Sequence, residues 1–156
     1  MNYFVNNREV IKNIAFNTGT SSTAEWTPIC TTSEVELTTD LETKDFYVFC
    51  DAIKRQLVTG AGVSLDTTVK LDINNEAIQD IIAKVHTLIV DGEVAQFNNV
   101  EVQFELLETV TSNVLTYKKY KANATLNFSD LGGAAEDEGE FSLEIMINGK
   151  ASVVTA

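Results

Sequence analysis

The chain has 156 residues, of which 44% are hydrophobic and 22% charged, and this is the length and composition of one folded domain. A formal net charge of -12 excludes binding DNA by neutralising its phosphates. Polar residues interrupt the opening "MNYFVNNREVIKNIAF", and no apolar run approaches the ~18 residues of a membrane span, so we expect synthesis in the cytoplasm and no membrane association.

Two strands are the first clear elements in chain order, after a Ser- and Thr-rich loop at 18–27. Apolar and polar residues alternate from 34 to 39 and again from 63 to 73. In the first segment Val35 and Leu37 share one face, and Glu34 and Glu36 share the other. This period of two is typical of strands that bury one face, so we predict two half-buried strands.

Residues 40–62 separate these strands and show no regular period. A segment of about 20 residues is too long to be only a connection between two strands of a compact domain. We therefore interpret the segment as a projecting hairpin or loop. Its aromatic content favours binding to a neighbouring copy, with order gained on assembly. The residues assigned to this assembly loop are Lys44, Asp45, Phe46, Tyr47, Phe49 and Arg55.

One helix is predicted at about 76–90, because apolar residues recur there at helical spacing. Asn74 or Asn75 is the expected N-cap, and Gly92 is the expected C-cap. The apolar stripe covers one side only, so we expect the helix to lie on a sheet. The residues expected to pack on that sheet are Ile78, Ile81, Ile82, Val85 and Ile89.

Three further strands follow the helix at 100–106, 114–128 and 141–147. In the first, the doublet Leu106-Leu107 breaks the alternation and indicates a β-bulge. An acidic, glycine-rich loop precedes the last strand, and its run from Glu136 to Glu140 lacks the alternating ligand spacing of a calcium loop. We therefore interpret this loop as solvated charge and not as a metal site.

No set of catalytic residues emerges from the sequence. His86 is the only histidine and lies within the predicted helix, and no phosphate-binding glycine motif is present. Cys30 and Cys50 are expected to be buried thiols without chemistry. We accordingly expect no enzymatic activity, no cofactor and no metal.

The order of these parts resembles the major tail proteins, or tail-tube proteins, of long-tailed bacteriophages. The resemblance is carried by Trp26-Thr-Pro-Ile-Cys30, "TTDLETKDFYVFC", "VSLDTTVKLDINNEAIQDII" and "GGAAEDEGEFSLEIMINGK". It implies a single, mainly β domain, a β-sandwich or barrel with one flanking helix, whose end forms a penultimate strand, a turn and a last strand. It also implies a virion protein whose hexameric rings stack into a tail tube, contact other tail proteins and pass DNA without specific binding.

The negative net charge agrees with the tail-tube resemblance, because a tube wall lined with carboxylates repels DNA phosphates. The residues assigned to the lumen or to charged contacts between copies are Glu101, Glu105, Lys118, Lys119, Lys121, Glu136, Asp137, Glu138 and Glu140. A second hypothesis remains open, in which the chain is a monomeric β-sandwich that binds carbohydrate or protein. Its contact surface would be the aromatics Trp26, Phe46, Tyr47 and Phe49.

Overall fold

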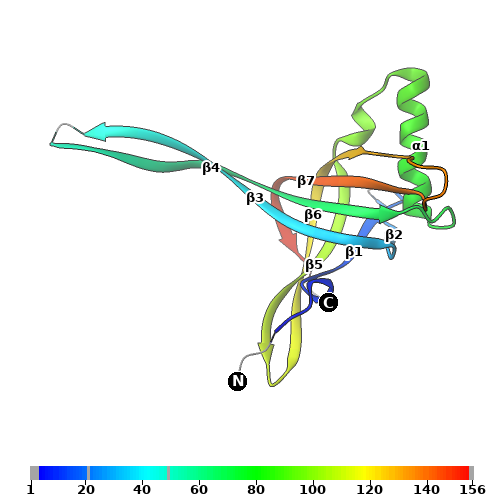
Figure 1. Cartoon of the computed structure of the whole chain (residues 1–156), viewed down its shortest axis with the longest axis horizontal. Helices are drawn as coiled ribbons and strands as arrows, with labels where there is room; N and C mark the ends of the chain where they lie inside the picture. Colours follow the sequence, from blue (N-terminus) through cyan, green and yellow to red (C-terminus); the bar gives the residue numbers. More distant parts are fainter. Residues whose placement is uncertain (1–3, 21, 49, 155–156) are drawn as a thin grey trace.

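The computed structural model describes residues 4–20, 22–48 and 50–154 (Figure 1). Strands dominate this part of the chain, as the sequence predicts. In chain order the elements are η1 (Asn7–Glu9), β1 (Ile11–Asn17), β2 (Trp26–Pro28), β3 (Thr32–Val48), β4 (Asp51–Lys70), α1 (Glu76–Asp91), η2 (Ala95–Phe97), β5 (Val100–Thr111), β6 (Val114–Ser129) and β7 (Glu140–Val153).

The strands form one antiparallel sheet in the order β2-β1-β5-β6-β7-β4-β3. β2 and β3 are its two edges, yet only Ile29 to Thr31 separate them in the chain. Six interstrand gaps would hold the edges of a flat sheet ~29 Å apart, whereas Pro28 to Thr32 can span at most ~14 Å. The sheet must therefore curl. Of the two architectures expected from the sequence, a sandwich or a barrel, the curled sheet is closer to the barrel.

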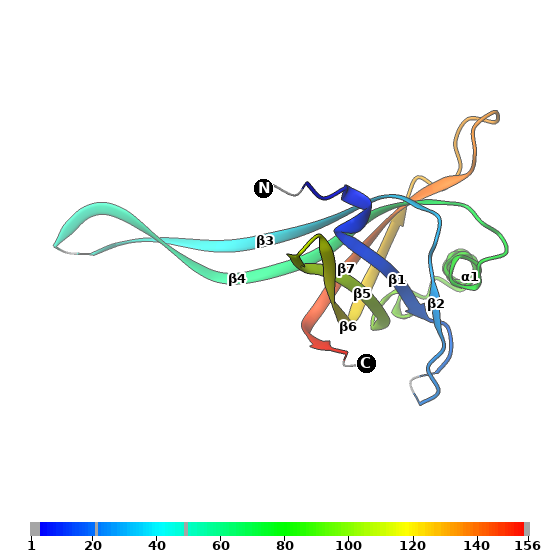
Figure 2. The same ribbon diagram turned by 90° about the horizontal axis from the view of Figure 1, so that it is seen from below.

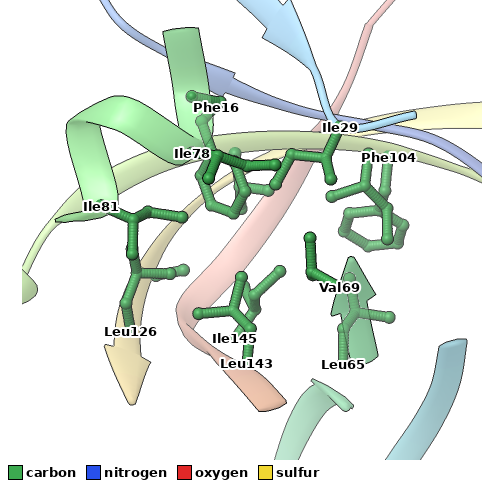
Figure 3. Packing of buried hydrophobic residues seen from close by; sticks show 14 of the residues in the cluster. Phe16, Ile29, Leu65, Val69, Ile78, Ile81, Phe104, Leu126, Leu143 and Ile145 are labelled. Atoms are coloured by element: carbon green, nitrogen blue, oxygen red, sulfur yellow. The ribbon is translucent and has the colours of Figure 1, made fainter. Parts of the chain in front are cut away.

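The hydrophobic core fills the inside of this curl (Figure 3). Alternate residues of each central strand point inward, and α1 adds side chains from its first turns. Apolar residues that are almost completely buried come from four strands and the helix: Leu65 and Val69, Val102, Ala124, Phe141, Leu143 and Ile145, and Ala77 and Ile78.

Helix α1 begins and ends where the caps predict. The Asn75 side chain accepts hydrogen bonds from the amides of Ala77 and Ile78, and its amide group donates to the Pro28 carbonyl of β2 at 2.9 Å. Gly92 ends the helix with φ 68°, a conformation that favours glycine. The cap thus fixes the start of α1 against the edge of the sheet.

The prediction for the packing face of α1 is correct for its first half and wrong at its end. Ile78 and Ile81 are buried, and Ile82 packs against the core. Ile89, however, is 74% exposed. Helical spacing identifies one side of a helix, but the end of α1 extends beyond the sheet (Figure 1), where Leu88 still lines a groove with β6 and Ile89 is exposed.

A long two-stranded arm leaves the body of the molecule (Figures 1 and 2). β4 pairs with β7 only from Val63 to Lys70, so its residues 51–62 have β3 as their one neighbouring strand among the described residues. Twelve strand residues extend ~40 Å. Segment 40–62 is therefore mostly paired strand, which confirms the projecting hairpin of the two forms expected from the sequence, and the order gained on assembly stays a prediction.

Two predicted strand ends also differ from the structure. The strand expected at 63–73 stops at Lys70, because the Asp72 side chain accepts from the Asn74 amide and turns the chain toward α1. At "NGK" the resemblance implies a turn between two strands, but β7 runs on to Val153. Gly149 lies where its register with β6 shifts, between the pairs Asn123–Asn148 and Lys121–Ser152. The expected bulge in β5 is present between Leu107 and Thr109.

Candidate functional site

The residues assigned to the assembly loop lie at the far end of the arm. Lys44 pairs with Leu57 and Phe46 pairs with Arg55 across the two strands, and Asp45 forms an ion pair with Lys54 at 3.1 Å. Phe49 lies outside the described residues. The structure therefore groups the described residues of this set at the tip of a projecting hairpin, one of the two forms predicted from the sequence.

The arm exposes apolar side chains that the body does not cover. Leu41, Leu57 and Val58 are each 56–57% exposed, and Tyr47 is 68% exposed. A two-stranded ribbon has no core of its own, and an isolated hairpin is marginally stable in water. Exposed apolar surface of this kind is typical of a contact with another chain.

The aromatic residues of the second hypothesis do not form one surface. Trp26 lies in the body, where the ammonium group of Lys121 sits 5.7 Å from its ring centroid. Phe46 and Tyr47 lie at the tip of the arm. A carbohydrate- or peptide-binding groove lined by these aromatics is therefore not supported.

Two basic residues of β6, Lys118 and Lys121, already have partners within the chain. Lys118 lies 3.8 Å from Glu108, and Lys119 is directly opposite Glu105 on β5. Lys121 contacts Trp26 as described. None of these contacts involves the acidic loop, so one subunit does not bring the predicted basic and acidic groups together.

Glu101 and Glu105 are also partnered. The Asn17 side chain donates to Glu101 at 2.8 Å, and the Asn13 side chain donates to Glu105 at 2.7 Å. Both glutamates thus serve contacts between β1 and β5. Their role as free lumen charge is not supported by this arrangement.

The acidic loop is held to the body by Lys70. The Lys70 ammonium donates to Glu140 at 2.8 Å and lies 3.9 Å from Glu138, whereas Glu136 and Asp137 are exposed. The hydrogen bond from Lys70 to Glu140, together with the negative charge of Glu140, raises the pKa of Lys70 above its ordinary value. This ion pair fastens the end of the loop where β7 begins.

A row of three carboxylates crosses the outer face of the sheet, and the sequence analysis did not find it. Glu36 on β3 is directly opposite Asp66 on β4, and Asp66 is directly opposite Glu144 on β7. Like charges at directly opposite positions destabilise a sheet. Among the described residues these three carboxylates form no salt bridge, and Asp66 accepts a hydrogen bond from the Thr38 hydroxyl at 3.2 Å.

The row lies within four adjacent strand segments that we call the carboxylate block. Their register is continuous: β3 residues 34–38 pair with β4 residues 64–68, these with β7 residues 142–146, and these with β6 residues 125–129. β5 begins opposite Ala124. Among the described strands, residues 34–38 and 125–129 therefore have a neighbour on one side only, and the block has two open edges.

The remaining candidate residues are one histidine and two cysteines. His86 lies on the exposed side of α1, and Cys30 and Cys50 are exposed thiols, so the expectation that they are buried is wrong. Within residues 4–20, 22–48 and 50–154, no three acidic, histidine or cysteine side chains are grouped to hold a metal ion. The one α-helix of that part of the chain is too short and too polar to cross a membrane.

Comparisons with known proteins identify solved structures with a similar fold, although the sequence itself has no match. No protein-family model matches the sequence, and no curated protein matches it. A chain from the tail of an empty gene transfer agent particle, refined with C6 symmetry, is 12% identical with a TM-score of 0.56, covering 97% of this chain and 100% of that one. A chain of the anti-feeding prophage baseplate, symmetrised six-fold, is 10% identical with a TM-score of 0.54, covering 99% and 97%.

The SPP1 tail tube provides a third likeness. Its chain is 11% identical with a TM-score of 0.55, covering 90% of this chain and 74% of that one. Identities this low establish the fold alone. The chain therefore has the fold of tail and tail-tube proteins, as the sequence predicts.

Proposed function

We propose that the chain is a structural subunit of a phage-like tail tube. The observation that carries this proposal is the shared fold, which extends over 97% of this chain and the whole of the gene transfer agent tail chain. The site supports a structural role, because the arm and the open edges are surfaces for other chains. On this proposal the protein acts in the virion tail, contacts other tail proteins and catalyses no reaction.

Copies associate as hexameric rings that stack into a tube. Six-fold symmetry is a property of the gene transfer agent tail and of the anti-feeding prophage baseplate, and we extend it to this chain. The two open edges of the carboxylate block support ring formation, because an unpaired edge is a template for pairing with another chain. When two different surfaces of a subunit meet head to tail, the copies close into a ring if the rotation between neighbours allows closure.

The carboxylate block faces the lumen. Glu36, Asp66 and Glu144 keep their charges close together at a cost in subunit stability, and a function outside the subunit accounts for that cost. In a channel for DNA such a face repels phosphates, so the duplex slides without adhering. This assignment replaces Glu101 and Glu105, which have partners in their own chain.

The arm contacts a neighbouring subunit and so links copies along the tube. Its ~40 Å reach beyond the body and its exposed apolar residues support this role. The tip residues Lys44 to Arg55 are the contact region.

Electron microscopy of the purified chain tests the proposal directly. We expect rings or tubes with a central channel at high protein concentration. A variant that combines Glu36→Gln, Asp66→Asn and Glu144→Gln should still form tubes. In co-sedimentation, DNA should be retained on the variant tubes and released from wild-type tubes. A chain that remains monomeric at all concentrations would show that the proposed function is wrong.

A further inference from the structure

One asparagine of β7 lies directly before a glycine, at the point where the strand leaves its neighbours. Asn148 and Gly149 are both exposed. β7 turns sharply in its last part, drawn in red (Figures 1 and 2). Its pairing with β4 ends at Ile147, and its pairing with β6 is interrupted between Asn148 and Ser152. Residues 149–151 therefore form no register pair with the described strands.

The peptide bond that joins Asn148 to Gly149 is open to its surroundings. Gly149 has φ 73°, a left-handed conformation that favours glycine. A Cβ added at Gly149 would meet no atom within 4 Å. Of the asparagines in the sequence, only Asn148 precedes a glycine. The nitrogen that follows this asparagine is thus hindered by neither a side chain of its own residue nor a packed neighbour.

This arrangement exposes the Asn148 carboxamide to attack by the next peptide nitrogen, and asparagine is a thermolabile residue. The Gly149 nitrogen forms a bond to Cγ of Asn148, and the carboxamide nitrogen leaves as ammonia. The proton of the Gly149 amide passes through water to the leaving nitrogen. Water then opens the cyclic imide at either carbonyl and gives aspartate or isoaspartate. One carboxamide and one water are consumed, and one carboxylate and one ammonium are formed.

One hydrogen bond of the folded chain opposes the reaction. The Asn148 carboxamide donates to the hydroxyl of Thr125 on β6 at 2.8 Å. The contact is exposed, so water competes for both partners. This hydrogen bond therefore slows the attack without preventing it.

The Asn148 side chain lies on the outer face of the sheet, which is also the face of the carboxylate row. Even-numbered residues of β7 share that face with Glu144, and Asn148 is directly opposite Asn123, which is neutral. Four strand residues place Asn148 ~13 Å along β7 from Glu144, beyond the ~8 Å over which exposed charges interact at physiological salt. A new carboxylate at position 148 is therefore tolerated beside the row.

We propose that Asn148 is a site of spontaneous deamidation, which proceeds through the cyclic imide formed with Gly149 and adds a carboxylate to the outer face of the sheet as the protein ages. Isoaspartate lengthens the backbone of β7 by one atom. The unpaired residues 149–151 absorb that change, so the pair between Lys121 and Ser152 is kept. The conversion itself needs no assembly, whereas the effect of the added charge on a channel rests on the proposed function.

Peptide mass spectrometry tests the reaction on folded protein incubated at neutral pH in water labelled with heavy oxygen. We expect progressive conversion at Asn148, with one labelled oxygen in the product. Asn123 and Asn127 are exposed on the same face of β6 but precede alanine and phenylalanine, so they should remain amides. Conversion of Asn148 no faster than that of Asn123 and Asn127 would overturn the proposal.

Two variants test the geometry. Thr125→Val removes the acceptor that holds the Asn148 carboxamide, and it should speed the conversion by roughly two- to tenfold. Asn148→Gln is the matched control, because its longer side chain must close a larger ring and it should stay an amide over the same period. A Thr125→Val variant that converts no faster than wild type, or an Asn148→Gln variant that converts as fast, would overturn the proposal.

A DNA measurement separates the modification from its effect on a channel. Asn148→Asp, added to the combined Glu36→Gln, Asp66→Asn and Glu144→Gln variant, should reduce the DNA retained on tubes, whereas Asn148→Gln in the same background should not. Equal retention in these two variants would overturn the effect on the channel and leave the modification standing. Wild-type protein that forms neither rings nor tubes would overturn the proposed function, and the mass spectra of the unassembled protein would still decide whether Asn148 deamidates.

Discussion

Replacing Asp66 by Asn should stabilise the isolated subunit. Asp66 is directly opposite two carboxylates, Glu36 and Glu144. Each cross-strand pair of this kind changes stability by roughly 0.2 to 1 kcal/mol, so removal of the central charge should contribute about 0.4 to 2 kcal/mol. The Asn side chain keeps an oxygen that can accept the hydrogen bond from Thr38. For a domain of this length, about 1 kcal/mol corresponds to a rise in melting temperature of about 2 to 4 °C.

Thermal unfolding of monomeric protein, followed by circular dichroism in low salt and in 1 M NaCl, measures this effect. The gain should shrink in high salt, where charges more than ~3 Å apart are screened. Asp40→Asn is the matched control, because Asp40 lies on the same face of β3 but opposite Gly62, and its melting temperature should not change. A destabilised Asp66→Asn variant, or a gain that is equal in both salt concentrations, would refute the repulsion argument.

Three further predictions concern the helix, the arm and the acidic loop. Ile78→Ala should cost about 2 to 5 kcal/mol in chemical denaturation because Ile78 is completely buried, whereas Ile89→Ala should leave stability within ~0.5 kcal/mol. Deletion of residues 44–55 should leave the melting temperature of the body unchanged but prevent tubes of normal length in electron micrographs. Lys70→Met should lower the melting temperature at neutral pH. Glu140 raises the pKa of Lys70, so the contribution of Lys70 to folding stability is complete at pH values below its ordinary pKa of 10.5. The difference in melting temperature between the variant and wild type should vanish as the pH rises through the raised pKa.

The sequence predicted α1 to within one residue at its end, because caps and helical spacing are local signals. The exposure of Ile89 could not be predicted, since it depends on where the sheet stops. For 40–62 the sequence left a hairpin and a loop as alternatives, and the structure shows the hairpin. Those residues mix charges, aromatics and glycines without alternation, and their strand conformation comes from pairing with each other.

The site was predictable only in part, and the reason is register. Glu34 and Glu36 were recognised as the polar side of one strand, and the alternating strand that contains Asp66 was predicted as well. Their alignment with Glu144, more than 70 residues away, depends on the pairing of β3, β4 and β7, which no local pattern specifies. The partners of Glu101 and Glu105 were not predicted for the same reason, because the asparagines that donate to them lie on β1.

The continuity of β3 and β4 from the body into the arm determines how the molecule bears tension. A pull on the tip acts along the length of β4, whose register with β7 runs without a break from Val63 to Lys70. Hydrogen bonds perpendicular to such a pull are loaded together in shear, whereas a pull across the strands would open them one after another. The arm is therefore anchored by a continuous run of hydrogen bonds in the body, and in the tail tube proposed above these bonds would share a pull on the arm.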